Sequence, residues 1–163
     1  MKPLFITVST VLLCVFVMVA VQDMKQNEIQ NYKLRYVTEE LSVTGTLFFD
    51  RYEYSQGRKV FNQVESLEAM EHQIKDLLRL DDDLNPFNDS YWTERVSYEV
   101  YFFDDSNTVY PYLFTDDDTL FTFVVTQPAC IVTVNAGKGR YRIPMFQNSG
   151  DNIRSAAHEW KSR

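Results

Sequence analysis

The sequence has few of the residues that interrupt regular structure or cross-link small domains. Its 163 residues include 5 Gly, 5 Pro and 2 Cys, and no Pro occurs between Pro3 and Pro86. Such scarcity excludes a collagen-like or low-complexity chain and a small disulfide-rich scaffold. Because 45% of the residues are hydrophobic, with 12 Phe and 10 Tyr, the sequence predicts a folded domain rather than a disordered tail.

Basic residues are outnumbered as well. The chain has 16 Lys and Arg against 23 Asp and Glu, a net charge of −7, and no basic stripe is visible in it. A negative surplus repels the phosphates of nucleic acids and anionic lipid headgroups. We therefore expect no nucleic-acid partner, and we interpret the surplus as a contribution to solubility.

Residues 3–22, PLFITVSTVLLCVFVMVAVQ, contain no charged side chain and no His. As a helix, the 18 residues from Leu4 to Val21 would be about 27 Å long, close to the thickness of a bilayer core. Cleavage of an export signal needs small residues one and three positions before the cut, and a cut after Ala20 would place Met18 at the second position. The sequence therefore predicts an uncleaved transmembrane signal anchor over residues 1–22, with membrane lipid around residues 4–21. A cleaved export signal is the alternative.

The flanking charges give a weak indication of orientation. Lys2 and the amino terminus lie on the short side, whereas Lys25, Lys33 and Arg35 follow the run among acidic residues. We expect a single-pass protein of a cell membrane, with the short head inside and the bulk extracytoplasmic. The membrane would separate Cys14 from Cys130, so no intrachain disulfide is expected, and the composition is typical of a bacterial surface protein.

Helical periodicity continues after the run. Tyr32 and Tyr36 belong to a series of residues at three- and four-residue steps, and Leu41, Phe48 and Tyr52 mark an apolar side. This pattern predicts that the anchor extends as a long amphipathic helix with a break near Gly45. Gly57 is expected to end the helical segment, and a second helix is expected over residues 59–80. The apolar face of this second helix is expected to consist of Phe61, Val64, Leu67, Ile74, Leu77 and Leu78, with Met70 beside it.

Residues 94–147 change in character. Segments rich in Val, Tyr, Phe and Thr alternate with short polar turns, which predicts an antiparallel β-meander. Its last hairpin is expected at Gly137 and Gly139, before a strand over residues 140–146. Residues 148–163 are interpreted as a polar tail that frays or forms a helical turn. The fold class is thus α+β, with one extracytoplasmic domain over residues 23–147.

Acidic clusters are the first candidates for chemistry. Asp81–Asp89 resembles the start of a calcium loop, but Pro86 and Trp92 occupy the positions of the required Gly and bidentate acid. A helix-terminating turn is favoured over a weak calcium site. The clusters at residues 104–107 and 115–118 are interpreted as solvated turn tips rather than acid–base pairs.

The other reactive side chains show no supporting pattern. His72 and His158 are far apart in sequence and lack the spacing of zinc ligands. Cys130 is interpreted as a buried packing residue rather than a nucleophile, and no nucleophile-elbow, P-loop or dinucleotide motif occurs. We therefore assign no catalytic residue, cofactor-binding residue or metal ligand, and expect a non-enzymatic protein without a cofactor.

Aromatic residues are concentrated in the first two expected strands, more densely than a small sheet can bury. Some of them are expected to form a contact surface. The residues concerned are Tyr98, Tyr101, Phe102, Phe103, Tyr110, Tyr112 and Phe114.

The order of these elements resembles a known family layout. A short head, an apolar helix that runs into an amphipathic extension and a small antiparallel sheet are similar to type IV pilin-like subunits, and more narrowly to the TadE-like minor pilins of Tad (Flp) pilus systems. The resemblance implies anchoring of a precursor by the helix and later packing against other pilus or membrane subunits. It assigns no individual functional residue.

Two functions are therefore expected, in order of preference. The first is assembly, as a pilin-like component of a surface appendage or secretion apparatus. The second is binding or sensing by a membrane-tethered extracytoplasmic module, through the aromatic side of the sheet. A hydrolase that uses the Asp clusters is a remote third.

Overall fold

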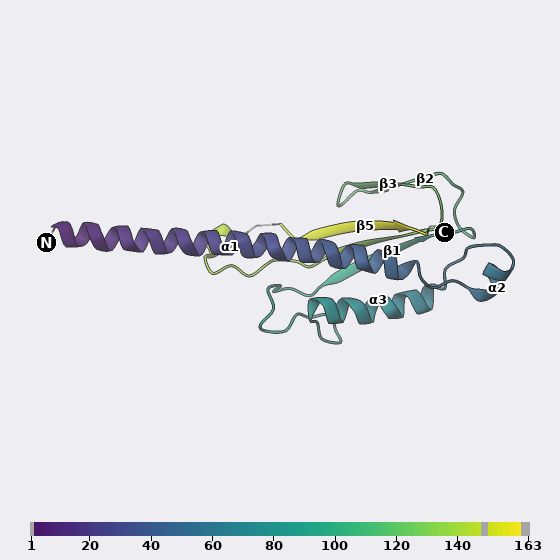
Figure 1. The fold of residues 1–163 in the computed structure, drawn as a ribbon, viewed down its shortest axis with the longest axis horizontal. Coiled ribbons are helices and arrows are strands. Elements are labelled where there is room, and N and C mark those ends of the chain that lie inside the picture. Colours follow the sequence, from purple (N-terminus) through teal and green to yellow (C-terminus); the bar gives the residue numbers. More distant parts are fainter. Residues whose placement is uncertain (1, 148–149, 161–163) are drawn as a thin grey trace.

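The computed structural model describes residues 2–147 and 150–160. It has an α+β fold, as the sequence predicts, with a long helix that projects from a domain of short elements (Figure 1). The helices are α1 (Lys2–Gly45), α2 (Arg51–Ser55), α3 (Gln63–Leu78) and the short 3-10 helix η1 (Pro144–Phe146). The strands are β1 (Ser97–Phe103), β2 (Tyr112–Asp116), β3 (Phe121–Val125), β4 (Ala129–Asn135) and β5 (Ile153–Glu159).

Helix α1 is 44 residues long and ends at Gly45, where the sequence predicts a break. Its second half packs on the domain through Leu34, Val37 and Leu41, all of which are 0% exposed. The expected series containing Tyr32 and Tyr36 does not face the core, because these side chains are 65% and 54% exposed. Three- and four-residue steps fit several faces of one helix, and the domain is packed against the face with smaller side chains.

Helix α3 is shorter than expected, and its buried face is only partly the expected one: Ile74 and Leu78 are buried as predicted, with Met70 beside them. Asn62 caps its start by accepting a hydrogen bond from the Glu65 amide, and Arg79 ends it in the left-handed conformation. The buried positions are Ser66, Met70, Ile74 and Leu78, whereas Val64 is 76% exposed and Leu67 is 39% exposed. Ser66 lies inside because its hydroxyl donates to the Gly45 carbonyl at 3.2 Å, a contact that only a small polar side chain can make where α1 and α3 converge.

The expected meander is wrong in its connectivity. One sheet has the order β1-β4-β5, and β2 and β3 form a separate hairpin. Strand β4 is antiparallel to both neighbours, with Val132 opposite Val100 and Ala156. Every β4 residue from Ala129 to Val134 is buried, because both faces of the strand are covered.

The carboxyl-terminal region also differs from the prediction. Residues 140–146, expected as a strand, form a loop that contains η1, and Gly137–Gly139 is not a hairpin. Residues 153–159, expected within a polar tail, form β5. This strand pairs with an edge of β4 whose buried amides and carbonyls would otherwise lack partners.

The sheet lies between two layers. On one face, Cys130, Val132 and Val134 pack with residues of α1 and α3. On the other face, Ala129 and Ile131 pack against Phe114 and Val125 of the hairpin. Figure 1 accordingly shows α3 and the β2–β3 hairpin on opposite sides of the sheet.

Candidate functional site: an apolar helix and its junction with the domain

The first half of α1 is apolar and uncovered. Among the described residues, one helix is long and apolar enough to cross a membrane. Its most apolar window, a stretch of 18 residues, has a mean hydropathy of 2.1. Only 11% of that window is buried, and Leu4, Leu12 and Met18 are each more than 60% exposed. A core helix of a globular domain would be covered instead. The remaining interpretations by composition are a membrane anchor and a signal sequence.

The polar atoms of this segment are compatible with an apolar surrounding. The Thr10 hydroxyl donates to the Ile6 carbonyl at 2.8 Å, within the helix. Backbone groups of a continuous helix satisfy one another in the same way. The segment can therefore leave water without losing hydrogen bonds at Thr10.

A polar junction follows directly after the apolar run. Asp23 is 6% exposed, although it lies only two residues after Val21. Its Oδ2 accepts hydrogen bonds from the backbone amides of Arg142, at 2.8 Å, and Ile143, at 3.1 Å. The Arg142 guanidinium donates to Gln22 Oε1 at 3.1 Å. The loop before β5 is thus tied to α1 at the point where the helix enters the domain.

Tyr91 strengthens the junction from a second loop. Its hydroxyl donates to Asn27 Oδ1 at 3.0 Å, and its ring meets Trp92 edge-on at 5.1 Å between centroids. Burial, followed by the effect of nearby Tyr141, raises the pKa of Tyr91. A Cβ on Gly139 would lie 2.4 Å from the Tyr91 ring, so only Gly permits this approach.

The rest of α1 is attached along the domain. Near the middle, Arg154 of β5 donates to Asn31 Oδ1 at 3.1 Å. At the far end, the Thr44 hydroxyl donates to Gln73 Oε1 at 2.5 Å. Contacts therefore extend from Asp23 to Gly45, and they fix the direction in which the apolar half leaves the domain.

The Asp81–Asp89 segment is a turn, as the sequence predicts. Asp81 Oδ1 accepts from the amides of Asp83, at 3.0 Å, and Asn85, at 2.8 Å. These bonds, that from Asn85 first, lower the pKa of Asp81. Within residues 2–147 and 150–160, no group of three or more His, Cys, Asp or Glu side chains could hold a metal ion.

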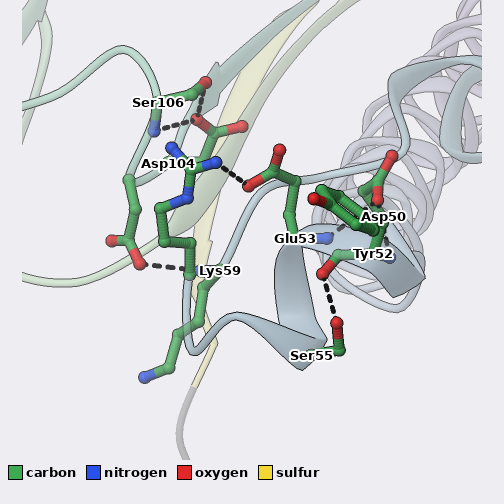
Figure 2. A network of polar contacts seen from close by, with 9 residues as sticks. Asp50, Tyr52, Glu53, Ser55, Lys59, Asp104 and Ser106 are labelled. Atoms are coloured by element: carbon green, nitrogen blue, oxygen red, sulfur yellow. Dashed lines mark hydrogen bonds and ion pairs between the residues drawn. The ribbon is translucent and has the colours of Figure 1, made fainter.

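Asp104 corrects the expectation of a solvated tip at residues 104–107. It is 1% exposed and accepts hydrogen bonds from the Phe61 amide at 3.2 Å and the Ser106 hydroxyl at 2.5 Å. Figure 2 shows Asp104 and Ser106 beside Lys59, with Asp50 and Glu53 of the α2 region nearby. Local sequence does not predict this burial, because one of the partners of Asp104, the Phe61 amide, lies on the segment before α3, 43 residues earlier in the chain.

Asp116 is also a structural residue rather than a free tip. Its Oδ2 accepts from Thr119 at 2.8 Å and from Thr133 of β4 at 3.3 Å. Burial acts to raise its pKa, but the hydrogen bonds from Thr119 and Asp118 outweigh burial and lower it. Asp116 therefore joins the hairpin to the sheet, while Asp117 and Asp118 are exposed.

The cysteine and histidine residues do not form a site. Cys130 is buried, as predicted, and burial raises its pKa to about 12, which makes it a poor nucleophile. Cys14 is exposed on the apolar helix, and both thiols are free. His72 lies on the surface, 3.3 Å from Asp76, and His158 lies in β5 opposite Cys130.

The aromatic cluster is mainly packing. The Phe114 ring contacts Tyr101 at 5.0 Å and Phe103 at 5.6 Å between centroids, and Phe114 is 8% exposed. Tyr98 and Phe102 pack against the helix side of the sheet. Tyr101 and Tyr112 remain 37% and 45% exposed, so a small aromatic surface is left at the hairpin.

Sequence reasoning did not identify the junction. An Asp directly after an apolar run was a possible signal, but nothing local indicates that Arg142, 119 residues later, would contact it.

Comparison of the chain with protein-family models, with curated proteins and with solved structures found no match.

Proposed function

We propose that the chain is a non-enzymatic, single-pass membrane protein that acts by assembly, as a pilin-like component of a surface appendage or secretion apparatus. The apolar half of α1 would lie in the membrane, and the domain would lie outside the cytoplasm. The observation that carries the proposal is the unbroken α1, uncovered in its apolar half and attached to the domain in the other half. The TadE-like resemblance agrees with this order of elements.

Assembly needs helices that can pack side by side. The exposed surface of the apolar half is a mixture of Leu, Val, Ile and Met side chains with Thr10. Packing between such helices in lipid depends on close van der Waals contact. Because α1 is attached rigidly to the domain, lateral packing of the helices would also set the spacing of neighbouring domains.

The anchor is tested by Leu12→Asp in the full-length chain. An Asp at the centre of the span costs about 2.5–3.5 kcal/mol for insertion, so the variant should appear in the alkaline carbonate supernatant while the native chain stays with the membrane. Leu47→Asp, which replaces a residue 65% exposed beyond the helix, is the control and should stay bound. Retention of Leu12→Asp in the pellet would contradict the proposal.

Assembly is tested with the native cysteine of the apolar helix. Cys14 is exposed and Cys130 is buried, so an oxidant should cross-link two copies only through Cys14. We expect a covalent dimer of the native chain in membranes and none with Cys14→Ser. A chain that remains monomeric at every density of the protein in the membrane would contradict assembly.

A groove favours a second candidate, a tethered binding or sensor module. It has a volume of about 800 Å³ and is lined by residues of α1, β3 and β5. Arg35, Glu39, Phe123 and Arg154 are among its lining residues. A monomeric chain with a saturable ligand that is lost in Phe123→Ala would favour this function over assembly.

A further inference from the structure

The end of the domain nearest the apolar run is formed by residues 139–147. The bonds from Arg142 and Ile143 to Asp23 place this loop beside the helix only two residues after Val21. Two residues correspond to about 3 Å along a helix axis. Figure 1 shows the yellow-green loop before β5 against α1 where the free half of the helix begins. If the apolar run lies in a bilayer, this loop lies at the bilayer surface.

The loop is held in place rather than hanging free. The Gln147 side-chain amide donates to the Gly139 carbonyl at 3.1 Å, and the Arg140 backbone amide donates to the Tyr91 carbonyl at 2.8 Å. Together with the Asp23 contacts, these bonds connect the loop to α1 and to residue 91. A surface built in this way presents its side chains at a defined height above the apolar run.

This surface carries positive charge, unlike the chain as a whole, whose net charge is −7. Lys25, Arg140 and Arg142 are exposed there and line a hollow of about 670 Å³. Asp23 and Asp89 also line it, but Asp23 is covered and bonded to backbone amides, and Asp89 lies 4.0 Å from the Arg79 guanidinium. The Asp89 side chain is itself 78% exposed, so the three basic groups share the accessible part of the hollow with one carboxylate and outnumber it.

An apolar side chain stands next to the basic groups. Met145 is 75% exposed in the short turn η1, three residues after Arg142. Basic side chains beside an exposed apolar one are typical of surfaces that rest in the headgroup region of a membrane. In that region phosphates meet the basic groups, and the first acyl carbons meet the apolar side chain.

We propose that this surface, formed by Lys25, Arg140, Arg142 and Met145 and named here the basic foot, binds the phosphate-bearing headgroups of the membrane that holds α1. The guanidinium and ammonium groups contact lipid phosphates, and Met145 enters the interfacial layer. The inference rests on the proposed membrane anchor. Its consequence is that the domain has a fixed orientation at the bilayer surface. The attached α1 then has a fixed tilt and rotation when it packs against neighbouring helices.

The depth of the foot is tested in the full-length chain with Cys14→Ser, reconstituted in phosphatidylcholine vesicles that contain a minority of phosphatidylglycerol. A nitroxide is attached after Met145→Cys or, as the control, after Val109→Cys. Val109 is 89% exposed in the loop after β1, at the end of the sheet near Gly45. We expect dissolved oxygen, which enters lipid, to increase the spin-relaxation rate of the nitroxide at position 145. A charged nickel complex, which stays in water, should increase the spin-relaxation rate of the nitroxide at position 109.

The role of charge is tested with spin-labelled lipids. The native chain should immobilise labelled phosphatidylglycerol in preference to labelled phosphatidylcholine, and R140Q/R142Q should lower this preference by about fivefold. The contacts with Asp23 come from backbone amides, so the variant retains them. R51Q/R58Q, which removes the same charge near α2 at the opposite end of the domain, should leave the preference unchanged.

The failures of the two proposals can be told apart. If the label at position 145 is as open to the nickel complex as that at position 109, while the chain resists carbonate extraction, the basic foot is wrong and the anchor stands. An unchanged lipid preference in R140Q/R142Q, or an equal loss in R51Q/R58Q, also overturns the foot. If carbonate releases the native chain, the anchor fails and the foot fails with it.

Discussion

Gly45 and Cys130 lie in such close contact that a Cβ on Gly45 would be 2.4 Å from the Cys130 sulfur. The contact joins the last residue of α1 to the central strand of the sheet. Met70 of α3 lies on the same side, with its sulfur 3.3 Å from that Cβ position. The three main elements of the core therefore meet at a position where only Gly fits.

Gly45→Ala is therefore expected to destabilise the domain. The added methyl group would overpack a site with no space, which costs about 1–3 kcal/mol. Thermal unfolding of the detergent-purified chain should show the loss. The double variant Gly45→Ala with Cys130→Ala should lose less stability than the sum of the losses in the two single variants, because removal of the sulfur makes room for the added methyl group. Strict additivity would contradict a direct contact.

Asp23→Ala should loosen the junction. It leaves the amides of Arg142 and Ile143 without their acceptor, at a cost of about 1–3 kcal/mol. Hydrogen exchange read by mass spectrometry should become faster in residues 139–147 and stay unchanged in β4. Asp23→Asn retains an oxygen acceptor and should lie between the two. Equal protection in all three chains would show that the bonds do not hold the loop.

Neighbouring residues of one turn should differ in their contribution to stability. Asp104 is buried and accepts bonds from Phe61 and Ser106, whereas Asp105 is exposed and accepts from the Lys59 amide at 2.7 Å. We expect Asp104→Ala to cost about 1–3 kcal/mol, since buried donors lose their partner, and Asp105→Ala to cost less than about 1 kcal/mol. Denaturant unfolding of both variants measures the difference. Equal losses would contradict the buried role of Asp104.

Acid should weaken the attachment of the β2–β3 hairpin. Burial opposes ionisation of Asp116 and Glu159, but hydrogen bonds, from Thr119 and from Thr126 respectively, outweigh it and lower both pKa values. A carboxylate whose pKa is lower in the folded state stabilises the fold above its ordinary pKa near 4, and the benefit is lost as the pH falls through the folded pKa. The unfolding temperature should therefore fall as the pH is lowered from about 5 to about 2.

The matched variant for the acid prediction is Asp116→Asn with Glu159→Gln. Its unfolding temperature should be lower than that of the native chain at neutral pH and should change less on acidification, because the titrating groups are gone. If the unfolding temperatures of the two chains fall equally as the pH is lowered, the loss of stability in acid comes from other carboxylates.

Local sequence was sufficient where a feature depends on neighbouring residues. The apolar run, the end of α1 at Gly45, the turn at Asp81 and the burial of Cys130 were all predicted from a few adjacent positions. It was insufficient where a face had to be chosen. On α1, Leu41 is buried as expected, but Leu34 and Val37 share its buried face, and the Tyr32–Tyr36 series with the same helical period is exposed.

By itself, then, the sequence determined an α+β chain with a long apolar amino-terminal helix, because hydropathy and helical period act over short distances. Only the tertiary structure decided that β4 pairs with β1 and β5, that residues 153–159 form a strand, and that Asp23 and Asp104 are buried. Each of these outcomes depends on partners far along the chain. A buried amide or carboxylate must find such a partner once water is excluded, and only the assembled fold brings the two together.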